Sequence, residues 1–204
     1  MNRNTIDELE MLNPFELGDL LIAEVNKDSP DVQVIQDLII VGCPIDARDP
    51  WGRTALHFAA HWGHLEIVKL MVSKGAEVDI RTIVGRTALH IAAFRGQIEV
   101  VKFLISNGAD IHARNNNGWT PLHSATQWGH LEMVKFLISK GADIHAVDNY
   151  DRTALHLGTI NRELYVCKLL VLMGAQVNAR TKGGYTAWDY ASAYLMEECP
   201  ELKP

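Results

Sequence analysis

The sequence is poor in the residues that build disulfide frameworks and zinc clusters. Only three cysteines, Cys43, Cys167 and Cys199, occur in 204 residues, their spacing is irregular, and there is no Asn-x-Ser/Thr sequon. This scarcity excludes a small disulfide-stapled domain and favours a reducing environment. We therefore expect an intracellular, cytoplasmic protein, an expectation that leaves a nuclear location or delivery into a host cell open.

Long hydrophobic runs and a basic leader are missing as well. Apolar runs such as Leu38 to Val41 fall far short of the roughly 20 residues that a membrane-spanning helix needs. The N-terminal stretch MNRNTIDELEMLNPFELGDLL is acidic and lacks the basic start and apolar centre of a signal peptide. Because 48% of the residues are apolar, the chain can bury a substantial core, and we expect a soluble monomer without a membrane partner.

Basic residues are also fewer than acidic ones. The 19 Lys and Arg residues are outnumbered by 25 Asp and Glu residues, which gives a net charge of −6 and disfavours a general nucleic-acid binder. Residues 1–49 hold 11 acidic and 3 basic residues, residues 50–196 hold 11 and 15, and residues 197–204 hold 3 and 1. The body of the chain is therefore mildly basic between two acidic ends.

Repetition is the feature that the sequence has in abundance. Four segments align with a step of 33 residues: GRTALHFAAHWGHLEIVKLMVSKGAEVD, GRTALHIAAFRGQIEVVKFLISNGADIH, GWTPLHSATQWGHLEMVKFLISKGADIH and DRTALHLGTINRELYVCKLLVLMGAQVN. Chance does not produce this regularity, so the chain is a repeat array. The step is kept by Thr54, Thr87, Thr120, Thr153 and Thr186 and by Gly42, Gly75, Gly108, Gly141 and Gly174.

Each copy carries the signals of two short helices. A threonine suits the N-cap of the first helix, Pro121 suits its first position in one copy, and a glycine turn precedes a second, amphipathic run. The run closes on a glycine such as Gly108, which we expect at positive φ. Small residues such as Ala59 and Ala60 allow close packing between neighbouring copies, so stability should come from stacking.

The 33-residue period, the T-A/P-L-H-x-A/G motif and the closing G-A resemble the ankyrin repeat over roughly Asp31 to Ala193. The resemblance implies an all-α repeat solenoid: helix-turn-helix pairs with β-hairpin tips in a slightly curved stack. It also implies that the TxLH histidines tie neighbouring tips together by hydrogen bonds. Asn178 stands in a slot that can be hydroxylated in the family.

The same alignment predicts the organisation of the chain. Residues 1–49 form an acidic N-terminal segment and a degenerate capping repeat, in which we expect Asp37, in an otherwise apolar slot, to face away from any neighbour. Residues 50–181 hold four full repeats, at approximately 50–81, 82–114, 115–147 and 148–180. Residues 182–204 supply a tip and a first helix, so either the C-terminal cap is reduced or the chain is a fragment.

Catalytic and metal-binding signatures are missing. There is no P-loop, GxGxxG, GxSxG or kinase motif. His57 and His61 have the i, i+4 spacing of a helical zinc pair, but no acidic residue completes a zincin motif, and only one copy has the second histidine. We therefore expect no enzyme activity, no cofactor and no metal.

Residues that vary from copy to copy carry the functional prediction. In ankyrin repeats the tips and the exposed ends of the first helices form the concave surface that binds partners, and Trp, Tyr and Arg dominate binding hot spots. An alternative for the arginines is pairing with tip aspartates such as Asp49 and Asp148, and Trp188 falls in a core slot instead. The candidate partner-binding residues are Trp51, Arg53, His61 and Trp62; Val84, Arg86, Phe94 and Arg95; Asn117, Trp119, Gln127 and Trp128; Tyr150, Arg152, Ile160 and Asn161; and Tyr185.

These features predict a non-enzymatic scaffold or adaptor that binds another protein. A partner with an acidic or mixed segment and apolar anchors would suit the mildly basic, aromatic surface. One alternative is single-stranded nucleic-acid binding, because aromatic and arginine side chains along a groove can stack bases and contact phosphates. A second alternative is a targeting module of a larger enzyme.

Overall fold

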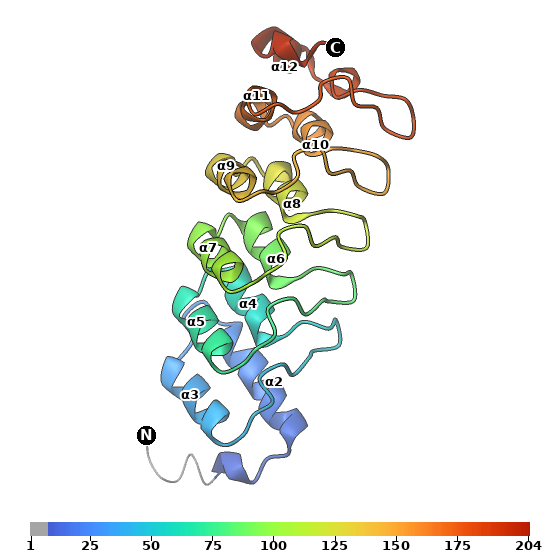
Figure 1. Cartoon of the computed structure of the whole chain (residues 1–204). Coiled ribbons are helices and arrows are strands. Elements are labelled where there is room, and N and C mark those ends of the chain that lie inside the picture. The colour runs from blue at the N-terminus through green and yellow to red at the C-terminus, as the bar shows by residue number, and fades with distance from the viewer. Residues whose placement is uncertain (1–7) are drawn as a thin grey trace.

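The computed structural model describes residues 8–204, in which pairs of short helices stack in chain order (Figure 1). Residues 1–7 of the expected N-terminal segment lie outside the described part. The prediction of an all-α repeat solenoid is confirmed. The pairs are α2 (Pro14–Val25) with α3 (Val32–Ile40), α4 (Ala55–Trp62) with α5 (Leu65–Ser73), α6 (Ala88–Arg95) with α7 (Ile98–Ser106), α8 (Pro121–Gln127) with α9 (Leu131–Ser139), and α10 (Ala154–Ile160) with α11 (Leu164–Leu172).

A loop precedes the first helix of each full repeat, and these loops all project to the same side of the stack (Figure 1). We call residues 49–53, 82–86, 115–119, 148–152 and 181–185 the tips, α4, α6, α8 and α10 the inner helices, and α5, α7, α9 and α11 the outer helices. Within residues 8–204 no helix combines the length and the apolar character that crossing a bilayer requires.

The tips are turns, and not the β-hairpins that the family resemblance implied. Each is closed by two backbone hydrogen bonds; in the first tip Asp49 N–H donates to the Arg53 carbonyl at 2.9 Å, and Gly52 N–H donates to the Asp49 carbonyl at 2.8 Å. In the described chain the only β-type pairing is the isolated bridge between Val147 and Thr153. Five residues are too few for a ladder of bonds within one tip. Neighbouring tips are instead joined to each other, for example by Ile83 N–H donating to the Trp51 carbonyl at 3.0 Å.

The TxLH histidines connect each inner helix to the next tip, as predicted. The ring of His90 accepts a hydrogen bond at Nδ1 from Thr87 N–H and donates from Nε2 to the Trp119 carbonyl at 2.9 Å. His123 does the same with Thr120 and with the Arg152 carbonyl, at 3.2 Å. Because Nδ1 accepts from a backbone N–H, the proton of the neutral ring lies on Nε2. Burial lowers the pKa of both rings to about 4.

The interface between inner helices is built from small residues. Ala59, Ala60, Ala92 and Ala93 are fully buried, and α4 packs on α6 as α6 packs on α8. A larger side chain at any of these positions would push neighbouring helices apart. The residues that repeat from copy to copy therefore form the scaffold of the stack.

The N-terminal pair corrects one expectation. Asp37 is 3% exposed and does not face solvent. Its Oδ1 accepts a hydrogen bond from Gln33 Nε2 at 3.0 Å. Leu9 and Leu12, which precede α2, also pack against the core. They therefore cover apolar residues at this end of the stack, where the sequence predicted no neighbouring repeat.

The C-terminal end also differs from the prediction of a tip followed by one first helix. A 3₁₀ turn, η1 (Trp188–Tyr190), takes the place of that helix and packs on α10. The chain then turns to extended backbone at Ala191, and α12 (Ala193–Glu198) and η2 (Pro200–Leu202) follow. η2 packs against α11, so this short segment covers the last outer helix. Trp188 is partly buried against the core, in line with its predicted core slot.

The fourth repeat holds Arg162 in the left-handed backbone region, at φ +63°. The equivalent residues of the other repeats are glycines, such as Gly63 at φ +78° and Gly96 at φ +72°. An L-residue in this region is strained by roughly 1–2 kcal/mol, whereas glycine loses roughly 0.5–1 kcal/mol more chain entropy on folding.

Replacing Arg162 with glycine is therefore expected to raise the free energy of unfolding by about 0.5–1 kcal/mol, as measured by urea denaturation. Asn161→Gly is the matched control because Asn161 has φ −89° and gains nothing from glycine. A gain of equal size in both variants, or no gain in Arg162→Gly, would contradict the assigned strain.

Candidate functional site

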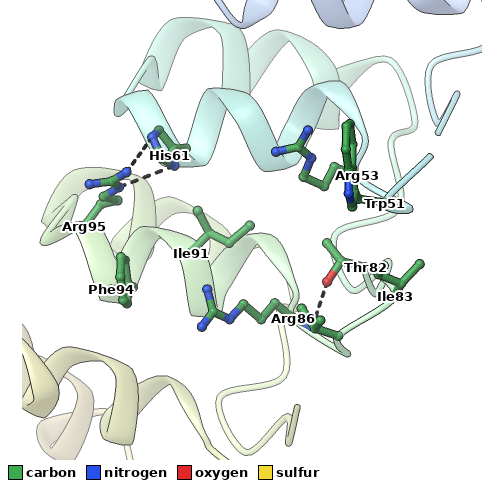
Figure 2. A pocket seen from close by; sticks show the side chains of 10 residues that line it. Trp51, Arg53, His61, Thr82, Ile83, Arg86, Ile91, Phe94 and Arg95 are labelled. Atoms are coloured by element: carbon green, nitrogen blue, oxygen red, sulfur yellow. Dashed lines mark hydrogen bonds between the residues drawn. The ribbon is translucent and has the colours of Figure 1, made fainter. Parts of the chain in front are cut away.

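Most of the candidate residues from the first two full repeats surround one cavity. This cavity, the first pocket, has a volume of about 340 Å³ and lies between two neighbouring tips and the inner helices α4 and α6 (Figure 2). Sequence comparison missed three lining residues, although Ile83 and Ile91 also stand in slots that vary between copies. The lining residues are Trp51, Arg53, His61, Thr82, Ile83, Val84, Arg86, Ile91, Phe94 and Arg95.

A second pocket lies at the other end of the row of tips. Its volume is about 230 Å³, and three of the candidates, Tyr150, Arg152 and Tyr185, contribute to its lining. Tyr190 of η1 was not predicted, although its ring centroid lies 5.7 Å from that of Tyr185. Tyr190 stands in the same varied slot as Ile91, but its position beside Tyr185 depends on η1, which replaces the expected first helix. The remaining lining residues are Thr181, Lys182 and Gly183.

The other candidates lie outside both pockets, and one of them extends the first pocket. The ring of Trp128 stands edge-on to Phe94, with the ring centroids 5.1 Å apart, and thus carries the aromatic surface into the third repeat. Trp128 is 54% exposed and Trp51 is 57% exposed. The candidates outside the pockets are Trp62, Asn117, Trp119, Gln127, Trp128, Ile160 and Asn161.

Two of the candidate tryptophans also hold neighbouring repeats together. Trp62 Nε1–H donates to Asn26 Oδ1 at 3.0 Å, and Trp119 Nε1–H donates to Asp148 Oδ2 at 3.1 Å. Trp119 is in addition only partly exposed. The sequence could not reveal these bonds, because each joins residues that lie in different repeats. Trp62 and Trp119 therefore contribute to the scaffold.

Two tip arginines form ion pairs inside their own tips. This is the pairing with tip aspartates that the sequence offered as an alternative to partner binding. Arg53 Nε lies 2.7 Å from Asp49 Oδ2, and Arg152 Nη2 lies 2.6 Å from Asp148 Oδ2. Burial would raise the pKa of Asp148, but the hydrogen bonds from Arg152 outweigh it and hold that pKa below its usual range. Arg53 also lies over the Trp51 ring, 4.8 Å from its centroid.

Arg86 and Arg95 differ from Arg53 and Arg152 in their charge partners. Among residues 8–204 no carboxylate lies within 4.0 Å of either side chain. Their guanidinium carbons lie 5.4 Å and 5.6 Å from the centroid of the Phe94 ring. Arg95 also donates to His61 at 2.9 Å, and burial together with the nearby Arg95 charge lowers the pKa of His61 (Figure 2).

The spaced histidine pair and the lining of the pockets show which groups the candidate surface offers. His57, half of the spaced histidine pair, uses Nδ1 to bind Thr54 and Nε2 to bind the Arg86 carbonyl. Across the described residues, no group of three or more His, Cys, Asp or Glu side chains is arranged to hold a metal ion. The pockets instead present aromatic faces and guanidinium groups, which are the partners of cation–π contacts.

Stacked helix pairs with a row of tips define the class: this is a helical repeat protein with pockets along its tips. The chain belongs to the ankyrin repeat family, because the family description "ankyrin repeats (3 copies)" matches residues 20–115 and 107–181. No curated protein matches the chain. Ankyrin repeats are generally protein–protein interaction modules, and the family is typically non-enzymatic.

Proposed function

We propose that the chain is a non-enzymatic adaptor that binds another protein on the surface formed by the tips and the inner helices, which we call the binding surface. The observation that carries the proposal is the first pocket, where apolar walls and two uncompensated arginines lie beside the exposed rings of Trp51 and Trp128. An apolar patch that is contiguous and exposed commonly marks a site where another molecule binds. Once covered, tryptophan and arginine contribute most to binding.

A protein partner is favoured over a nucleic acid by the charges of this surface. Because Arg53 and Arg152 are paired with Asp49 and Asp148, each ion pair is neutral overall and attracts phosphates only weakly. A nucleic acid would need a continuous row of free cations, and its affinity would fall steeply with salt. The three cysteines are buried and free, which supports placing the protein in the reducing cytoplasm.

Affinity capture tests the proposal. We expect immobilised wild-type chain to capture a partner protein that the double variant Trp51→Ala, Trp128→Ala loses. The matched control removes two exposed apolar side chains from α11, Tyr165→Ala and Leu172→Ala, which are 73% and 84% exposed, and it should capture the same protein as wild type. Loss of the partner from the α11 variant alone would show that the outer helices bind it, and would refute the proposal.

A further inference from the structure

Arg86 occupies a slot in which the equivalent arginines of other repeats hold a carboxylate. Arg53 binds Asp49 and Arg152 binds Asp148, in each case four residues earlier in the same tip. The residue four positions before Arg86 is Thr82, whose Oγ1 accepts only the backbone N–H of Arg86, at 3.1 Å (Figure 2). The second tip therefore keeps the arginine and lacks its acid.

The next tip does not supply the missing acid either. Trp119, the counterpart of Arg86 one repeat later, reaches forward to Asp148 in the following tip. The equivalent residue in front of Arg86 is Asn115, which uses its Oδ1 to accept the backbone N–H groups of Asn117 and Trp119. Both slots that could neutralise Arg86 are thus occupied by uncharged residues.

The surroundings of Arg86 favour an anion that has an apolar neighbour. No acidic side chain lines the first pocket, whereas Arg53, Arg86 and Arg95 all do, and only Arg53 has a carboxylate partner. The remaining walls are largely apolar, among them Trp51, Ile83 and Phe94. A partner segment seated against these walls would exclude water, and a charge-assisted hydrogen bond is stronger where water is excluded than at an open surface. The volume, about 340 Å³, is at the small end of ligand pockets, so it suits side chains and not a folded element.

We propose that the first pocket binds the carboxylate of an aspartate or glutamate in a peptide segment of the partner protein, with the adjacent apolar side chain of that segment against Trp51 and Ile83. The partner carboxylate takes the place at Arg86 that Asp49 takes at Arg53. A carboxylate is favoured because Arg53 and Arg152 bind one in the same slot, and the planar fork of a guanidinium matches its two oxygens. This inference rests on the proposed function and specifies the chemistry of the partner.

The decisive variant is Thr82→Asp, which restores the internal acid. The new carboxylate is expected to pair with Arg86 as Asp49 pairs with Arg53, and to close the subsite without disturbing the fold. Ser106→Asp is the matched control, because Ser106 is exposed on the outer helix α7, away from the tips and the inner helices. The control adds the same charge to a surface that takes no part in the proposed binding. Circular dichroism and urea denaturation establish that both variants are folded.

The probe is a displayed library of random 12-residue peptides, selected on wild type and followed by fluorescence anisotropy with the enriched peptides. We expect enrichment of an acidic residue beside an apolar one. Thr82→Asp should weaken binding of such a peptide by about tenfold or more, as should changing the acidic residue of the peptide to its amide. Ser106→Asp should change it less than about twofold.

Four results would overturn the subsite. These are enriched peptides without an acidic residue, equal losses in the two aspartate variants, tighter binding of a phosphoserine peptide than of its glutamate form, and failure of wild type to enrich any peptide. The first result, combined with loss of binding in Trp51→Ala, Trp128→Ala, would leave the proposed function standing. Affinity capture with that double variant judges the proposed function independently, because it does not depend on the peptide library.

Discussion

The free energy of unfolding is expected to stay nearly constant above pH 7 and to fall steeply between pH 6.5 and pH 4.5. The cause lies in the TxLH histidines, whose neutral rings accept a backbone N–H at Nδ1 and donate from Nε2 to the next tip. Protonation puts a hydrogen on Nδ1 and breaks the first of these bonds. Burial accordingly lowers the pKa of His90 and His123 to about 4, whereas the same side chains titrate near 6.5 in an unfolded chain.

The direction in which stability changes with pH follows from the pKa difference between the folded and unfolded states. A base with a lowered pKa in the folded state is stabilising above its unfolded pKa, and the contribution is lost as the pH falls toward the folded value. At pH 4.5 each of the two histidines should lower the free energy of unfolding by on the order of 2–3 kcal/mol relative to pH 7. The two contributions together are a large fraction of the stability of a small protein. The low pKa of Asp148 acts mainly below this window, since its contribution is lost only as the pH falls below the ordinary carboxyl range.

Urea denaturation at pH 7.0, 5.5 and 4.5 measures the effect. The control is the double variant His112→Gln, His145→Gln, which removes two exposed histidines and should reproduce the wild-type profile. Replacing His90 and His123 with asparagine should lower stability at pH 7 and flatten the profile. A wild-type profile that is flat down to pH 4.5 would contradict the assigned role of the buried rings.

Gly118→Ala is expected to lower the free energy of unfolding by about 3 kcal/mol, the largest effect that we predict for a single methyl group. Gly118 has φ +78°, and a Cβ there would lie 2.9 Å from the backbone nitrogen of Asn149. That nitrogen donates to the Asn117 carbonyl at 3.0 Å and joins two tips. The added methyl group therefore strains its own backbone and also pushes the neighbouring tip away.

Gly108→Ala isolates the first of these two effects. Gly108 ends α7 at φ +90°, the positive φ expected from the sequence, and a Cβ there would meet nothing within 4 Å. We expect a loss of about 1 kcal/mol, since only backbone strain opposes the substitution. Urea denaturation of both variants gives the comparison. Equal losses in the two would show that contact between tips contributes nothing.

The scaffold was predictable from the sequence because each repeated residue acts locally or on an identical neighbour. Threonine caps, closing glycines and the small alanines of the inner helices follow from the period alone. The ends were less predictable, because the burial of Asp37 and the break at Ala191 depend on segments that belong to no repeat. The β-hairpins inferred from the family were wrong for a related reason, since hydrogen bonds between tips replace a ladder within each tip.

The candidate surface was predictable as a set of varied positions but not as a set of interactions. Comparing the copies does show Thr82 where two other tips have aspartate. It does not show that Arg86 then lies beside Phe94 without a carboxylate, because this depends on side chains from two tips and one inner helix. The bond from Trp62 to Asn26 likewise joins residues 36 positions apart. Roles that depend on such contacts between repeats required the structure.

Binding and stability measured on the same variants test whether the partner binds along the tips and the inner helices. Isothermal titration with the captured partner and urea denaturation are applied to wild type, to Trp51→Ala, Trp128→Ala and to the control Tyr165→Ala, Leu172→Ala. We expect the first double variant to bind about 30-fold more weakly, equivalent to about 2 kcal/mol, and to unfold within about 1 kcal/mol of wild type. The control should match wild type in both measurements. Wild-type affinity in the tryptophan variant, or weakened binding confined to the α11 control, would contradict the claim that the binding surface lies along the tips and the inner helices.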